Sequence, residues 1–189
     1  MLSAEDRAKL EAERRALRAY WAGNQGEPFT LELHDAYCVC DVPFASLFAY
    51  ARLLFRCAAM KIVSLLAFSP LKVFFYRLFG VRIGRGVFIA PGVFIDPLFP
   101  WLIELEDGCL LGMGCRLFTH EYTATSFRIG RVRVGKGSVV GAYATVRSGV
   151  SIGSKVTIGF NSYVNKDVPD GATVGGVPAK ILKTDPERL

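Results

Sequence analysis

The clearest pattern of hydrophobic and polar positions in this chain is a six-residue period that starts after Gly80. Each unit opens with Ile, Leu or Val, glycine is frequent at its second position, and its fifth position is small or β-branched. The period breaks off after Ile95 and after His120, then runs on from Val134. A repeat of fixed period predicts a stacked architecture of short, similar elements. The units begin at Ile83, Ile89, Ile95, Leu105, Leu111, Leu117, Val134, Val140, Val146, Ile152, Ile158 and Val164.

Six residues per unit fit a coil with three flat sides, one short strand on each side. The first and fifth residues would point inward, and the glycine at the second position would let the backbone turn the corner. Successive coils would stack as parallel strands, so Val134 is expected over Ile152. Cys109 and Cys115 occupy fifth positions and are expected in the core. We therefore predict a mainly β fold, a parallel β-helix of about four coils.

The N-terminal region lacks this period and is expected to be largely helical. Residues 3–22 are predicted to form a helix, and residues 28–42 a short strand or extended connection. Residues 43–79 are apolar and broken only by cations, in charge-free runs too short for a transmembrane span. Two interpretations stay open: a helical cap packed on the repeat or on a neighbouring subunit, and helices lying at a membrane interface. The predicted divisions are 1–80, 81–183 and a tail, 184–189.

Charge and cysteine usage narrow the cellular setting. The net charge of +6 suits an anionic partner, but the basic residues are dispersed, so nucleic acid is not expected. The charged first residues argue against a signal peptide, so we expect a cytoplasmic protein, with peripheral contact at the inner face of the membrane as the open alternative. Five cysteines then read as thiols. His34, Cys38 and Cys40 form a loose cluster whose spacing is untypical of zinc sites, and no metal is expected.

The repeat resembles the left-handed β-helix hexapeptide-repeat acyltransferases, and among them the sugar O-acetyltransferases, over about residues 81–183. That resemblance implies a left-handed coil, acetyl-coenzyme A as acyl donor, and a homotrimer whose sites lie between subunits. In this family the loop that interrupts the repeat carries a histidine followed by an acid and Tyr, with Phe a few residues on. His120, Glu121, Tyr122 and Phe127 match that motif.

The chemistry of acyl transfer explains why a histidine is needed. A sugar hydroxyl is too weak an acid to attack a thioester unaided at neutral pH, and imidazole is a suitable base. His120 is predicted to take the hydroxyl proton and return it to the coenzyme A thiolate, without an acyl-enzyme. Glu121 is predicted to orient the imidazole or bind the acceptor.

The resemblance also implies the donor side of the site. The main-chain N–H groups of Ala142 and Phe160 would contact the thioester, and the ending VNKDVPDGATVGGVPAKILK would contact the nucleotide. Val139 stands where many members carry an aromatic residue, and Phe160 where they carry a small one, so the acyl-chain length stays open. The expected cofactor-binding positions are Val139, Gly141, Gly159, Lys166, Gly175, Gly176, Lys180 and Lys183.

We therefore expect transfer of an acetyl or short acyl group to a hydroxyl of a sugar, or of a polysaccharide or lipid-linked precursor. Two alternatives stay open: N-acetylation of an amino sugar, and a non-catalytic β-helix scaffold. A metal enzyme of the carbonic anhydrase type needs three histidines, and this chain has only His34 and His120.

Overall fold

The structure, a computed structural model, describes residues 12, 15, 29–32, 47–122 and 126–184. The helix expected over 3–22 lies mostly outside the described residues, as do His34, Cys38 and Cys40. Within the stretch expected to be extended, Phe29–Glu32 forms strand β1, and the rest lies outside.

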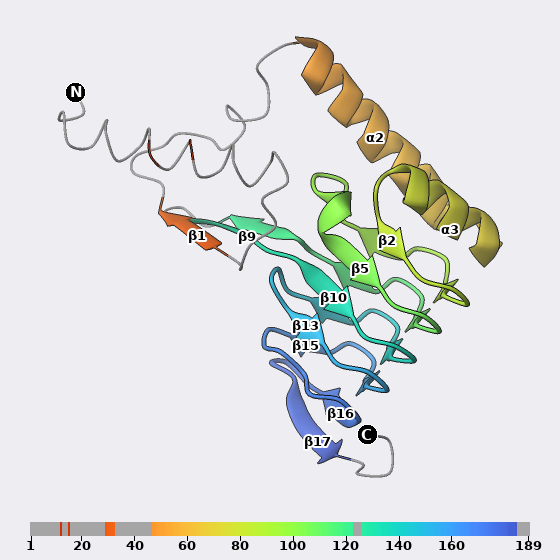
Figure 1. The fold of residues 1–189 in the computed structure, drawn as a ribbon, viewed down its shortest axis with the longest axis vertical. Helices are drawn as coiled ribbons and strands as arrows, with labels where there is room; N and C mark the ends of the chain where they lie inside the picture. The colour runs from red at the N-terminus through yellow and green to blue at the C-terminus, as the bar shows by residue number, and fades with distance from the viewer. Residues whose placement is uncertain (1–11, 13–14, 16–28, 33–46, 123–125, 185–189) are drawn as a thin grey trace.

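The repeat region winds into a three-sided parallel β-helix of four coils and part of a fifth (Figure 1). Each side is one sheet whose strands come from successive coils. Side 1 contains β2 (Arg82–Ile83), β5 (Ile103–Leu105), β10 (Val132–Val134) and β13 (Ser151–Ile152). Side 2 contains β3 (Phe88–Ile89), β6 (Leu110–Leu111), β11 (Val139–Val140), β14 (Thr157–Ile158), β16 (Ala172–Gly175) and the antiparallel β17 (Lys180–Thr184). Side 3 contains β4 (Phe94–Ile95), β7 (Arg116–Leu117), β12 (Thr145–Val146) and β15 (Tyr163–Val164).

The interior is built from the positions that the period singled out. Val134 pairs with Ile152, as predicted, while Ile83 lies beside Leu105 and Leu105 beside Val134, across the two interruptions. First-position residues after Ile83 are buried, and Cys109 and Cys115 are buried at fifth positions, which confirms their place in the core.

The role expected for the second-position glycines is wrong. The left-handed backbone conformation that turns each corner falls on the fourth position, at Gly137 with φ 67° and at Lys155 with φ 54°. The second position needs glycine for a different reason, because neighbouring coils touch there. A Cβ at Gly135 would lie 2.4 Å from the carbonyl carbon of Gly153.

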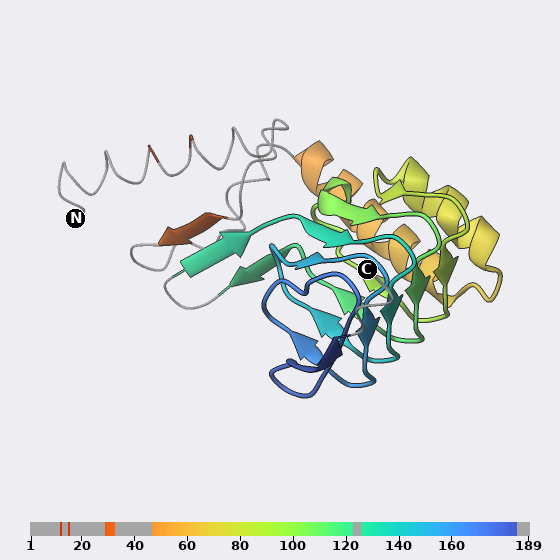
Figure 2. The ribbon, with the colours of Figure 1, turned by 60° about the horizontal axis from the view of Figure 1, so that its bottom comes forward.

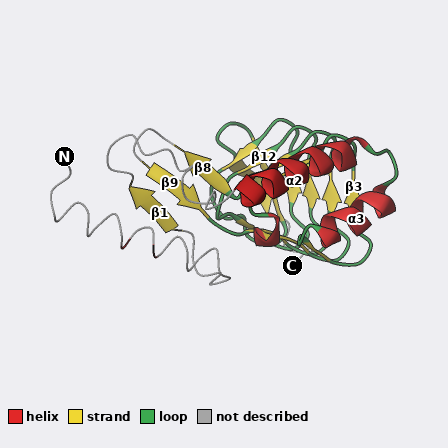
Figure 3. Cartoon of the chain, turned by 90° about the horizontal axis from the view of Figure 1, so that it is seen from above, coloured by secondary structure: helices red, strands yellow, loops and turns green. Residues whose placement is uncertain are grey.

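Helices α2 (Leu47–Leu65) and α3 (Ser69–Leu78) cover the end of the β-helix at its first coil (Figures 1 and 3). Tyr76 is buried in the same core cluster as the coil residues, and main-chain N–H groups of the first coil donate to Ser64 O and Ser69 Oγ. Among the described residues, no helix combines the length and apolarity needed to cross a bilayer.

The two interruptions form distinct elements. The first contains a short 3-10 helix, η2 (Pro100–Leu102). The second is an antiparallel hairpin of β8 (His120–Tyr122) and β9 (Ser126–Ile129), which projects from the coils beside β1 (Figure 2). Strand β1 pairs with β9, so the N-terminal region contributes to this sheet across the predicted boundary at residue 80, and the division into domains stays a prediction.

Candidate active site

His120 lies where the chain leaves side 3 and the hairpin begins. Its Nδ1 lies 2.5 Å from Oδ2 of Asp96, at the corresponding corner of the coil above. The side chain of His120 is 15% exposed, whereas that of Asp96 is completely buried. A buried acid bonded to a partly exposed imidazole is an arrangement that orients a general base.

Asp96 is ionised, although burial alone would raise its pKa. Hydrogen bonds from His120 and from Thr119, through both N–H and Oγ1–H, outweigh that effect and hold the pKa of Asp96 below its ordinary value. Leu98 N–H donates to the other carboxylate oxygen at 3.0 Å. Because an ionised carboxylate only accepts hydrogen bonds, Nδ1 of His120 carries a proton, and the neutral ring has its lone pair on Nε2.

Aromatic rings enclose the imidazole on two sides. The ring centroid of Phe99, from the first interruption, lies 5.7 Å from that of His120, and the centroid of Tyr122 lies 5.2 Å away. Both pairs meet edge to face. Phe99 is buried, so the first interruption forms a fixed wall for the site in the second.

Glu121 is turned away from His120 towards the coil below. Its two oxygens accept from Arg147 Nε, each at 2.9 Å, and Oε1 also accepts from Ser148 Oγ at 2.8 Å. The residue that orients the imidazole is therefore Asp96, which the sequence analysis did not single out. The available signal was an acid at the second position of a unit, where glycine is common, just before an interruption.

Three of the expected cofactor-binding glycines and both expected main-chain donors stack along a different corner, between side 2 and side 3. Gly141 with Ala142, Gly159 with Phe160, and Gly175 occupy this corner in successive coils. The coils touch at Gly141, where a Cβ would lie 2.5 Å from the Ile158 carbonyl oxygen.

Main-chain N–H groups are capped differently at the three corners. At the other two corners, five third-position N–H groups donate to a carboxylate of a neighbouring coil or of the hairpin, although, in the described part of the chain, those of Asp107 and Lys166 do not. At the side 2–side 3 corner, within the described residues, the N–H groups of Ala142 and Phe160 donate no hydrogen bond. Two preorganised donors are thus available to a ligand. The capped pairs elsewhere, at 2.7–3.2 Å, are Arg85–Asp107, Lys136–Glu106, Ser154–Asp170, Thr119–Asp96 and Ser148–Glu121.

The remaining expected residues are spread over the lower coils. Val139 is half-buried on β11 of side 2, and Gly176 follows β16 with φ 97°. Lys180 and Lys183 are exposed on β17, and the exposed Lys166 lies at the corner that carries His120, two coils below it. One chain therefore groups the glycines and main-chain donors at one corner and places His120 at another.

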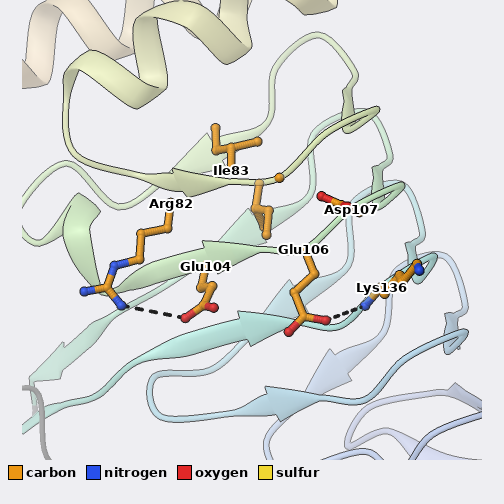
Figure 4. A pocket seen from close by; sticks show the side chains of 8 residues that line it. Arg82, Ile83, Glu104, Glu106, Asp107 and Lys136 are labelled. Atoms are coloured by element: carbon orange, nitrogen blue, oxygen red, sulfur yellow. Dashed lines mark hydrogen bonds and ion pairs between the residues drawn. The ribbon is translucent and has the colours of Figure 1, made fainter.

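A hollow of about 400 Å³ on side 1 contains none of these residues (Figure 4). Its acids already have partners: Glu104 pairs with Arg82 and Arg131, and Asp107 with Arg85. Glu106 pairs with Arg133 and accepts from the Lys136 N–H. We assign no chemistry to this hollow. Within the part of the chain that the structure describes, no group of three or more His, Cys, Asp or Glu residues could hold a metal.

Comparison with known proteins identifies similar chains. A family model described as bacterial transferase hexapeptide (six repeats) matches residues 131–166. The protein named "Putative acetyltransferase YvoF" of Bacillus subtilis (strain 168) is 36% identical over 121 residues, which cover 64% of this chain and 70% of that protein. The protein named "Putative colanic acid biosynthesis acetyltransferase WcaF" of Escherichia coli (strain K12) is 26% identical over 136 residues, covering 59% and 74%.

Solved structures share the fold. A hexapeptide-repeat-containing acetyltransferase of Vibrio cholerae O1 biovar eltor, complexed with acetyl coenzyme A, has a TM-score of 0.61 and 22% identity, covering 74% of this chain and 90% of that one. A maltose O-acetyltransferase of Clostridium difficile 630 has a TM-score of 0.53 and 16% identity, covering 70% and 88%. These likenesses confirm the predicted fold class, a left-handed parallel β-helix.

Proposed function

This chain belongs to the hexapeptide-repeat acetyltransferases, and on that premise we propose that it moves an acetyl group from acetyl-coenzyme A to a hydroxyl of a sugar, or of a polysaccharide or lipid-linked precursor. The observation that carries the proposal is the hydrogen bond between His120 Nδ1 and the buried Asp96. An imidazole fixed through Nδ1, which turns Nε2 to the acceptor, is the base that a hydroxyl acceptor requires.

The transfer is direct. As the acceptor oxygen attacks the thioester carbonyl, its proton passes to Nε2 of His120, and the ion pair with Asp96 stabilises the imidazolium that forms. The carbonyl oxygen becomes an oxyanion that accepts hydrogen bonds from the Ala142 and Phe160 N–H groups. The C–S bond then breaks, and the imidazolium returns the proton to the thiolate, leaving an acetyl ester and coenzyme A.

A homotrimer completes this site. His120 and Ala142 lie at different corners of the same prism, so a base from one chain and amide donors from the next can meet where two prisms pack side by side. Closed threefold symmetry would create three identical junctions. Within the junction, Lys180 and Lys183 provide charge for the phosphates of the donor.

The proposal is tested by thiol release from acetyl-coenzyme A over a panel of free sugars, sugar nucleotides and glycolipids, with His120→Ala run beside the wild type. Losing a general base should reduce kcat by at least about a hundredfold. Binding of acetyl-coenzyme A, followed by calorimetric titration, should persist in the variant. Undiminished turnover in His120→Ala would refute its role as base, and a chain that binds no acetyl-coenzyme A would instead be a scaffold.

A further inference from the structure

Helix α2 is apolar on its outer face as well as on the face that packs on the core. At 100° per residue, Leu54, Phe55, Ile62 and Leu65 share one face, and all are exposed, Phe55 to 71%. The opposite face packs on the first coil through the buried Met60 and Val63, beside the buried Ser64. A surface helix that only caps a core is normally polar on its outer face.

Helix α3 also has exposed apolar side chains. Its buried residues are Ser69, Lys72 and Tyr76, whereas Phe74 is exposed to 57% and Leu78 to 68%. Lys72 Nζ and Tyr76 Oη are both buried without a hydrogen-bond partner among the described residues. Both helices thus present exposed apolar side chains away from the core, and two polar groups without partners lie buried beneath α3. Apolar patches of this kind mark contact surfaces.

Charge limits what can cover this surface. Residues 43–80 contain no Asp or Glu and five cations. Arg56 is turned inward and Lys72 is buried, while Arg52 and Lys61 are exposed on either edge of the apolar stripe of α2. An apolar stripe flanked by cations alone is complementary to a surface with an apolar interior and an anionic face.

The surface lies at the end of the prism (Figures 1 and 3). In a trimer formed through the sides, the three ends would face in one direction and make a single platform. A flat partner would then contact all three copies, and the combined contact would be much tighter than that of one copy.

We propose that the outer face of α2 and α3 docks on an anionic lipid bilayer. The helices lie in the plane of the interface, with Phe55, Ile62 and Phe74 among the acyl chains and with Arg52 and Lys61 at the lipid phosphates. A lipid bilayer is favoured over a protein partner. An apolar face flanked only by cations can enter a fluid anionic bilayer, which needs no pockets shaped to fit its side chains.

Docking would place the candidate active site close to the membrane. Arg56 of α2 donates from Nη2 to the Leu98 carbonyl at 2.9 Å and lies over the ring of Trp101. Leu98 and Trp101 lie on either side of Phe99 in the chain, and Phe99 forms the wall of the His120 site. We therefore assign the acceptor to glycans carried on a lipid, an assignment that rests on the proposed function.

The test is co-sedimentation of the full chain with vesicles of equimolar phosphatidylglycerol and phosphatidylcholine, and with phosphatidylcholine alone. The wild type should bind the anionic vesicles more tightly and lose binding at high salt. Arg52→Gln and Lys61→Gln should each weaken binding roughly fivefold, the equivalent of about 1 kcal/mol per basic residue. Phe55→Ser with Phe74→Ser should weaken it at least about tenfold.

Matched controls lie on the prism. Lys136→Gln removes an exposed lysine from the coils, and Ile181→Ser removes an exposed apolar side chain from β17 at the far end, so both should bind vesicles as the wild type does. Absence of wild-type binding, or equal binding by the Phe55→Ser, Phe74→Ser variant, would overturn the proposal. So would light scattering that shows assembly beyond the trimer, lost in that variant, because the face would then bind protein.

This result can be separated from failure of the proposed function. His120→Ala should bind vesicles like the wild type, and the Phe55→Ser, Phe74→Ser variant should still bind acetyl-coenzyme A. With a lipid-linked sugar in vesicles as acceptor, that variant should lose turnover through a raised KM at unchanged kcat. Equal KM values for both proteins would contradict the assignment of the acceptor.

Discussion

Asp96 has no exposed surface, yet it keeps its charge because His120 and Thr119 donate to it. The same contact fixes the tautomer and direction of the imidazole. In sequence, the acid lies in the first coil and the histidine at the end of the second, so only the stacking of coils brings them together. His120 was predictable because the repeat breaks there. Its partner Asp96 was not, because the first interruption of the repeat lies between the two residues and hides which positions of the first two coils stack on each other.

Asp96→Asn tests this contact. An amide of the same shape can hold the ring but offers an N–H in place of an acceptor oxygen, which favours the wrong tautomer. We expect kcat to fall by at least about a hundredfold with KM little changed.

Asp107→Asn is the matched control, because Asp107 also accepts from a main-chain N–H of a neighbouring coil but touches no histidine. It should keep full turnover. Steady-state kinetics and thermal melting of both variants make the comparison. A folded Asp96→Asn protein with near wild-type kcat would show that the imidazole needs no carboxylate.

At the scale of the element, the period correctly predicted which residues point inward and how many coils they build. It did not reveal what the second-position glycines do. The left-handed conformation that turns the corner falls on the fourth position. Most units that adopt it have glycine there, but Tyr143, Lys155 and Asn161 take its place in three units, which hides the preference for glycine. Nor did the pattern of α2 show which face is buried, because a helix with apolar residues all around its first half has no sequence feature that selects one.

Gly135→Ala and Gly137→Ala separate the two roles of glycine. At Gly135 the new Cβ would meet the backbone of the next coil, which cannot move aside, so the cost should exceed about 3 kcal/mol, at the upper end for overpacking. At Gly137 the nearest atom is 4.0 Å away, and only the left-handed backbone conformation is penalised, by about 1–2 kcal/mol. Chemical denaturation measures both. Equal losses would mean that coil contact is not what selects glycine at the second position.

At the scale of the whole molecule, the amide donors and the base belong to different corners, and this separation is a property of topology. In every coil, the strand on side 2 is followed by the corner with the amide donors, and the strand on side 3 is followed by the corner at which His120 lies. A single chain cannot bring them together without unwinding its coils. The sequence could suggest the base and the amide donors separately. That they lie apart follows only from the three-sided winding, which places a strand of side 3 between the two corners.

Ala142→Pro removes one donor while keeping the turn. The same corner of the first coil already carries Pro91 at the third position, followed by Gly92 with φ 73°, so the substitution fits the local backbone. Alone, it should reduce kcat by about a hundredfold to a thousandfold, the usual cost of losing an oxyanion donor.

Mixing then tests the shared site. His120→Ala and Ala142→Pro are each nearly inactive, but trimers assembled from both by co-expression contain junctions where an intact His120 faces an intact Ala142. Random assembly in a closed threefold ring leaves about one quarter of the junctions intact, so about that share of wild-type turnover should return. Mixing folded, preassembled homotrimers without exchange is the control and should restore nothing. If co-expressed trimers stay inactive, both groups act within one chain, and the arrangement at the subunit junction proposed above is wrong.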